Sequence, residues 1–129
     1  DYEAQFLQEY ASHLGSQSLR AYLTNCGMAA FSTVLHWLAS EELPGASAVA
    51  FTPMYFENIH LARNFFPGLV AVDSRSTKTI LSTLRTNNPS VVLIDAVANC
   101  GEVLLHDINT VLNWAAVEAD PQRKVAVVI

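Results

Sequence analysis

The stretch Val91-Val92-Leu93-Ile94, followed at once by Asp95, carries the clearest information about the fold. Its four apolar residues lack the alternation of apolar and polar side chains that is typical of a strand with one face in water. A strand of this kind is buried on both sides, as in a parallel sheet that is covered by helices. Further strands are expected at four places along the chain: residues 19–23, 46–51, 69–72 and 125–129.

Helical patterns alternate with these strands. We expect helices over residues 3–14, 28–38, 54–65, 77–84 and 108–119, the last of them capped by Asp107. The segment 28–38 is apolar nearly all round, which predicts a buried helix. The alternation predicts an α/β fold with a mostly parallel sheet and helices on both faces, formed by residues 1–129 as one partial domain.

The composition excludes several classes of protein. Apolar residues make up 51% of the 129 residues, charged residues only 15%, the mean hydropathy is +0.25 and the net charge is −5. A soluble domain usually has about a quarter of its residues charged, so this chain resembles the core of something larger. The seven Lys and Arg residues do not cluster, which argues against a nucleic-acid partner. No apolar run approaches the ~20 residues that span a bilayer, so we expect no membrane partner.

The first residues and the cysteines give weaker expectations. The chain opens Asp1-Tyr2-Glu3, without an initiator Met or a basic leader, so we expect an excised segment of a longer protein. Cys26 and Cys100 stand far apart and in no metal-binding or redox spacing. A reducing, cytoplasmic location is therefore expected.

The strongest functional signal is Cys26-Gly27-Met28, where an expected strand runs into a turn and then a helix. The first turn of a helix offers free backbone N–H groups, and glycine lets an anion approach the backbone closely. This pattern favours a phosphate seat, although neither a dinucleotide fingerprint nor a Walker motif is present. The alternative is that Gly27 only eases a tight turn.

Two further signals follow other expected strands. Tyr55 comes just after the strand 46–51, where an aromatic ring can stack on a flat ligand; alternatively, it packs in the core with Phe56. Asp95 and Asn99 follow the strand 91–94, and we expect them in a loop at the same sheet edge. Asn99 is a candidate for hydrogen bonding to a ligand, or it is a turn residue before Gly101.

Other candidate chemistry has less support. The four histidines, at positions 13, 36, 60 and 106, share no metal-ligand spacing. Cys26 near a helix N-terminus is a candidate nucleophile for a hydrolase, but the sequence places no histidine or acid to serve it.

These motifs, in this order, resemble the cofactor domain of pyridoxal-phosphate enzymes with the aspartate-aminotransferase fold, in the cysteine and methionine metabolism branch. In that branch the sequence Ser-Gly-Met-Ala-Ala holds the cofactor phosphate, and the corresponding sequence here begins with Cys26-Gly27-Met28. The resemblance implies that Tyr55 stacks on the pyridine ring and that Asn99 binds its phenolic oxygen. It covers the chain from about residue 14 to residue 129.

The resemblance implies an enzyme that catalyses elimination or replacement at Cβ or Cγ of sulfur-containing or related amino acids through an aldimine. Such a transferase or lyase of transsulfuration binds pyridoxal 5'-phosphate and works as a homo-oligomer. The Schiff-base lysine lies outside this chain, so the chain alone is expected to be inactive and to depend on the rest of its polypeptide. Three positions depart from the branch: Cys26 replaces serine, Phe56-Glu57-Asn58 replaces Gly-Gly-Thr, and Cys100 replaces proline. They favour an alternative, a divergent non-catalytic α/β module used for assembly.

Overall fold

The chain forms two compact units, Asp1–Thr33 and Val34–Ile129, which are described here separately. The structure is a computed structural model and describes residues 2–14, 21–99 and 103–129. In the first unit, helix α1 spans Tyr2–Leu14, as expected. Residues 21–24 have no regular structure, so the strand expected over 19–23 is wrong for its described part.

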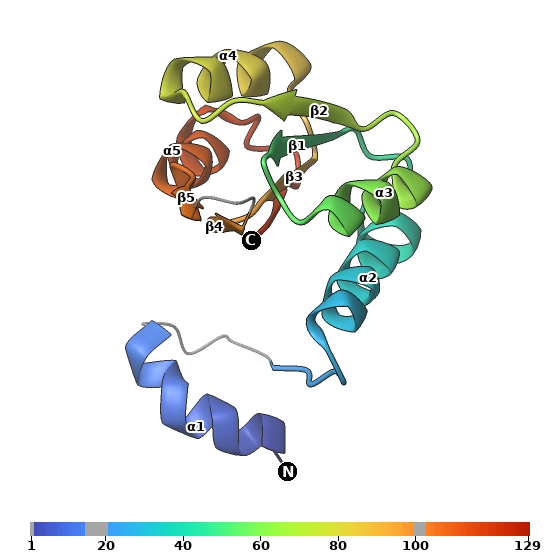
Figure 1. The fold of residues 1–129 in the computed structure, drawn as a ribbon, viewed down its shortest axis with the longest axis vertical. Coiled ribbons are helices and arrows are strands. Elements are labelled where there is room, and N and C mark those ends of the chain that lie inside the picture. The colour runs from blue at the N-terminus through green and yellow to red at the C-terminus, as the bar shows by residue number, and fades with distance from the viewer. Residues whose placement is uncertain (1, 15–20, 100–102) are drawn as a thin grey trace. The chain divides into compact units, whose positions relative to one another are not determined.

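The second unit is built on a four-stranded sheet (Figure 1). All three pairings are parallel, and the strand order is β2-β1-β3-β6. The strands are β1 (Ala48–Thr52), β2 (Val70–Asp73), β3 (Val91–Ile94) and β6 (Ala126–Val128). The chain therefore leaves β1 toward one neighbour, β2, and later returns to the other side of β1 as β3.

One face of the sheet packs against α4 (Thr77–Asn87) and the helix formed by α5 (Ile108–Asn113) with its π-helical continuation η2 (Trp114–Glu118). The core on this face joins alternate residues of β1 and β3 to the helices, because side chains alternate across a strand. Its buried members are Val49, Phe51, Ile80, Leu84, Val92, Ile94, Val111 and Trp114.

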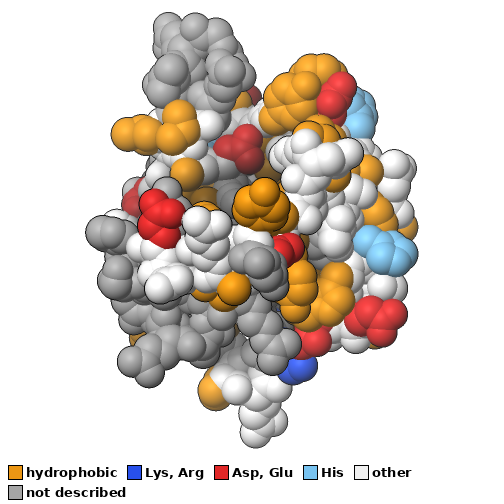
Figure 2. Space-filling model, turned by 90° about the horizontal axis from the view of Figure 1, so that it is seen from below, with side chains coloured by type: hydrophobic (Ala, Val, Ile, Leu, Met, Phe, Trp, Pro, Cys, Tyr) orange, Lys and Arg blue, Asp and Glu red, His pale blue; other side chains and the backbone are white. Residues whose placement is uncertain are grey.

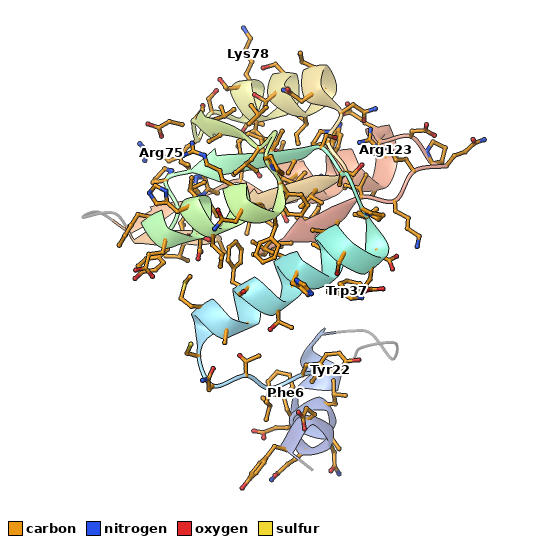
Figure 3. All side chains as sticks on the ribbon, turned by 90° about the vertical axis from the view of Figure 1, so that its right-hand side faces the viewer. Phe6, Tyr22, Trp37, Arg75, Lys78 and Arg123 are labelled. Atoms are coloured by element: carbon orange, nitrogen blue, oxygen red, sulfur yellow. The ribbon has the colours of Figure 1, made fainter. Side chains whose placement is uncertain are left out.

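The opposite face is covered by α3 (Phe56–Phe65), and Figure 3 shows α3 and α4 on opposite sides of the sheet. Ala50 and Leu93 of the strands and Ala62 and Phe66 of the α3 segment are buried. The expected fold class, a mostly parallel sheet flanked by helices, is confirmed.

Helix α2 (Gly27–Trp37) continues as a π-helical turn, η1 (Leu38–Glu42), and corrects one expectation. Leu35 is its one buried residue, whereas Val34 and Trp37 are 38% and 51% exposed. The expected buried helix is wrong for this chain, because apolar composition alone does not provide a surface to pack against.

A two-stranded antiparallel hairpin was not expected. Strand β4 (Val97–Asn99) pairs with β5 (Val103–Leu105). The expected loop at Asn99 is therefore wrong. Within the described ranges, none of the helices has the length and apolar character needed to cross a membrane.

Candidate functional site

The candidate site lies at the carboxyl ends of β1 and β3. These neighbouring parallel strands continue in different directions, since the chain leaves β1 for β2 on one side and leaves β3 for the β4–β5 hairpin. Open α/β sheets bind ligands at such topological switch points, beyond the carboxyl ends of the strands. Figure 1 shows α3 and the hairpin connected to these strand ends.

Tyr55 and Asp95 meet at this edge. The backbone N–H of Tyr55, which follows β1, donates a hydrogen bond of 2.9 Å to Oδ2 of Asp95, which follows β3. The Tyr55 side chain is 44% exposed, and its ring lies at a tilt against that of Phe56, with 5.1 Å between the ring centroids. Both rings are exposed in this chain, so the alternative that they pack in its core is wrong. A ring held in this way presents a surface for stacking.

His106 forms a hydrogen bond with the backbone of Asp95. Its Nδ1 lies 2.7 Å from the backbone oxygen of Asp95, and the residue is only 7% exposed. Because a carbonyl oxygen only accepts, Nδ1 carries the proton in this pair. Nε2 is buried and has no hydrogen-bond partner among the described residues. The sequence singled out His106 only as a histidine without metal spacing, and its place beside Asp95 comes from the β4–β5 hairpin.

Asn58 extends the same hydrogen-bonded chain into α3. Its backbone N–H donates to the carbonyl of Tyr55 at 2.9 Å. Its side-chain Oδ1 is buried, and no residue in the described ranges forms a hydrogen bond with it. A buried acceptor without a donor is costly, so Oδ1 of Asn58 and Nε2 of His106 are two points where this edge lacks a proton donor.

Asp107 anchors the helix that follows His106 and confirms the expected cap. Its Oδ1 accepts from the backbone N–H of Thr110 at 3.1 Å, and its Oδ2 accepts from the hydroxyls of Thr110 and Thr77 at 2.6 and 2.9 Å. These bonds favour the ionised carboxylate, so the Thr110 hydroxyl, and then the Thr110 amide and the Thr77 hydroxyl, lower the pKa of Asp107. The carboxylate thereby ties the starts of α4 and α5 together.

The candidate phosphate seat belongs to the first unit. Helix α2 begins at Gly27, and the carbonyl of Cys26 accepts its first helical hydrogen bond from Ala30 at 3.0 Å and a second bond from the Thr24 hydroxyl at 2.9 Å. The N–H groups of the first turn, including those of Gly27 and Met28, have no acceptor within the helix. A Cβ added at Gly27 would meet nothing within 4 Å, so the backbone here is open to a ligand.

The expected residues are therefore brought together only in part. Tyr55 and Asp95 meet in the second unit, whereas Cys26, Gly27 and Met28 lie in the first. Asn99 has its backbone in β4, opposite Val103. The side chain of Asn99, and Cys100 entirely, lie outside the described residues.

Charged and metal-binding groups add little to the site. On the face drawn in Figure 2, acidic side chains stand among apolar ones and little Lys or Arg is seen, in keeping with the net charge of −5. The structure shows no cluster of His, Cys, Asp and Glu suited to a metal ion in the part of the chain that it describes. The Lys78 side chain points away from the sheet on α4 (Figure 3), and Lys124 pairs with Glu42.

Comparison with known proteins identifies no family for this chain. The chain matches no model of a protein family and no curated protein.

Proposed function

We propose that this chain is part of the cofactor domain of a pyridoxal-phosphate enzyme that acts on sulfur-containing or related amino acids. The observation that carries the proposal is the hydrogen bond from Tyr55 to Asp95 at the switch point of the sheet. It joins the two strand ends that the sequence marked as functional, and it does so at the edge where parallel sheets bind ligands.

In this proposal Tyr55 provides the stacking surface for the cofactor ring. The backbone bond to Asp95 fixes where the aromatic side chain begins, and its partial exposure leaves a face for a flat ligand. His106 positions Asp95 through the Asp95 carbonyl. When bound, pyridoxal phosphate supplies an electron sink for carbanions of an amino acid.

The first turn of α2 is the proposed phosphate seat. Its N–H groups, which have no acceptor within the helix, and the positive end of the helix dipole favour an anion, and the open space at Gly27 fits a close approach. Cys26 offers only a weak thiol donor in place of a hydroxyl, so the seat relies on backbone N–H groups. Asn99 remains the proposed partner of the phenolic oxygen, and the covalent lysine is expected elsewhere in the polypeptide.

A rival proposal is a non-catalytic module used for assembly. The exposed Val34 and Trp37 on α2 favour it, since apolar side chains at an open helix face are typical of interaction surfaces. The two proposals differ in cofactor binding, which the assembly module does not need.

The test is equilibrium dialysis of the full-length protein with pyridoxal phosphate. We expect saturable binding that weakens about tenfold or more in Tyr55→Ala. Stacking of a flat heterocyclic ring on an aromatic side chain contributes about 1–3 kcal/mol. Tyr22→Ala is the matched control, because Tyr22 is an exposed tyrosine in the other unit. Absence of binding, or equal weakening in both variants, would favour the assembly module.

Gly27 gives a second and independent readout. Since a Cβ there meets nothing, Gly27→Ala should leave the thermal midpoint unchanged or slightly raised, because alanine is the better helix former. Gly27→Asp should weaken phosphate binding more than Gly27→Ala, because it places a like charge at the seat. Unchanged cofactor affinity in Gly27→Asp would remove the phosphate seat from the proposal.

A further inference from the structure

The opposite end of the same sheet has a pocket, at the amino ends of β1 and β3. A pocket of about 340 Å³ is bordered by residues 43–47, which lead into β1, by Ser90 just before β3, and by Arg123 just before β6. Figure 3 shows Arg123 at the far end of the sheet from Arg75, which follows the carboxyl end of β2. This pocket is thus separate from the Tyr55–Asp95 edge.

Two serine hydroxyls hold the guanidinium of Arg123 in one orientation. Its Nε and Nη2 donate to Oγ of Ser90 at 2.9 and 2.6 Å, and Nη2 also donates to Oγ of Ser47 at 3.2 Å. Nη1 has no acceptor among the residues that the structure describes. No carboxylate pairs with Arg123 among the described residues, whose ion pairs are Arg85–Glu118 and Lys124–Glu42.

The serines also have unused donors. Each serine oxygen accepts from Arg123, and neither hydroxyl donates a hydrogen bond to any residue that the structure describes. A hydroxyl carries one proton to donate besides its lone pairs. Ser90 is only 9% exposed, so its proton has little access to bulk water. The pocket therefore contains three donor groups, on Ser47, Ser90 and Nη1 of Arg123, and a positive charge that no described carboxylate neutralises.

The neighbouring charged groups do not supply the missing acceptor. Glu42, beside the pocket loop, binds the ammonium of Lys124. Oδ1 of Asp120 accepts from the backbone N–H of Gln122, and the backbone carbonyl of Asp120 accepts from the backbone N–H of Arg123. The Glu42 carboxylate and Oδ1 of Asp120 are thus bonded to groups other than the guanidinium.

We propose that this amino-edge pocket, formed by Ser47, Ser90 and Arg123, binds a small oxyanion, the carboxylate or phosphate group of a small molecule. A planar guanidinium with free N–H groups suits carboxylate and phosphate oxygens, and charge-assisted bonds are the stronger ones. The volume lies at the lower end of the range for small-molecule sites. The proposal is independent of the cofactor site, because no residue is shared.

The test is a titration of the chain with sodium phosphate and, separately, sodium acetate, at an ionic strength held constant with chloride. Amide NMR shifts of Ser47, Ser90 and Arg123 report binding at this pocket and distinguish it from phosphate binding at Gly27. We expect saturable shifts at these three amides. Preference for phosphate over acetate identifies a phosphate compound as the ligand class, and the reverse identifies a carboxylate.

Ser47→Ala is the sharper variant, because Ser47 is exposed and the bonds from Arg123 to Ser90 remain. We expect Ser47→Ala to weaken anion binding severalfold. Arg123→Met should abolish saturable binding. Arg85→Met is the matched control, since Arg85 is an exposed arginine with a carboxylate partner. Shifts that never saturate, or that persist unchanged in Ser47→Ala, would overturn the proposal and leave Arg123 as a clamp between strand ends.

Discussion

In the part of the chain that the structure describes, the buried polar atoms without partners are acceptors at the carboxyl ends of β1 and β3, whereas the unpartnered groups at the amino ends of the same strands are donors. The acceptors are Oδ1 of Asn58 and Nε2 of His106, and the donors belong to Ser47, Ser90 and Arg123. The strands and the core behind them are shared. The difference teaches that the sheet fixes where each edge lies, and that a few residues beyond each strand decide which chemistry the edge suits.

The largest expected effect comes from the core that both edges share. Phe51 is fully buried in β1, and Phe51→Ala should lower the free energy of unfolding by about 3–5 kcal/mol, through lost burial and the cavity that remains. Urea denaturation measures it. Val117→Ala, at an exposed position on η2, is the control and should change stability by less than about 0.5 kcal/mol. A loss of less than 1 kcal/mol in Phe51→Ala would show that the edges do not share one core.

The next effect is confined to the carboxyl edge. Asp95→Ala removes the acceptor of the Tyr55 N–H and should lower stability by about 1–1.5 kcal/mol, toward the upper end of the net value of a hydrogen bond, because water can replace the acceptor at this exposed position. Amide hydrogen exchange of Tyr55 should accelerate in parallel. Asp95→Asn keeps an acceptor oxygen and should recover most of the loss. Equal exchange rates in Asp95→Ala and the parent chain would contradict the role assigned to this bond.

A smaller effect concerns the cap beside the same edge. Asp107→Ala should lower stability by about 1 kcal/mol, as for other N-cap residues. Asp107→Asn, which keeps the cap acceptor but not the charge, is the matched control.

The same cap gives a pH dependence. Hydrogen bonds from Thr110 and Thr77 hold the pKa of Asp107 below its ordinary value of 3.8. The stabilisation is therefore complete above the unfolded-state pKa and is lost as the pH falls through the lower folded-state pKa. Acid titrations of stability in the parent chain and in Asp107→Asn should converge at the acid end. Curves that stay parallel would show that the charge contributes nothing.

The smallest effect should come from the exposed ion pair of Arg85 and Glu118. Their contact, at 2.7 Å, lies on the surface, where water and salt screen it. Arg85→Met should change the thermal midpoint little, and less at high salt. The half-buried Arg123 should give the larger loss on the same substitution, because its partners at Ser47 and Ser90 lose their donor. Equal losses would remove the contrast between the two arginines.

The parallel sheet was predictable from the sequence because burial on both faces leaves unbroken apolar runs, as in Val91–Ile94. The described part of the strand expected over 19–23, residues 21–23, is not a strand, because apolar residues form a strand only beside a partner strand. The hairpin of β4 and β5 was not predictable, because its strands have only three residues each. The sequence Asn99-Cys100-Gly101 between them is typical of a turn.

The candidate site was predictable where it follows a strand directly. Tyr55 and Asp95 each stand just beyond the end of an apolar run, so parallel pairing of β1 and β3 suffices to bring them together. The contacts of Arg123 with Ser47 and Ser90 had no such signal. Those residues stand 76 and 33 positions away, and no short spacing pattern encodes a contact between strand ends.

The strand order also bears on how the chain is made. Val49 of β1 pairs with Val70 of β2 and with Val92 of β3, so both neighbours of the central strand come from later parts of the chain. Because β3 is synthesised after β1 and β2, one side of β1 stays unpaired until β3 has left the ribosome, and its apolar residues and unpaired backbone are then open to other nascent chains. An inner strand that is buried at residues 48–51 in the finished molecule is thus exposed during synthesis until its second neighbour arrives.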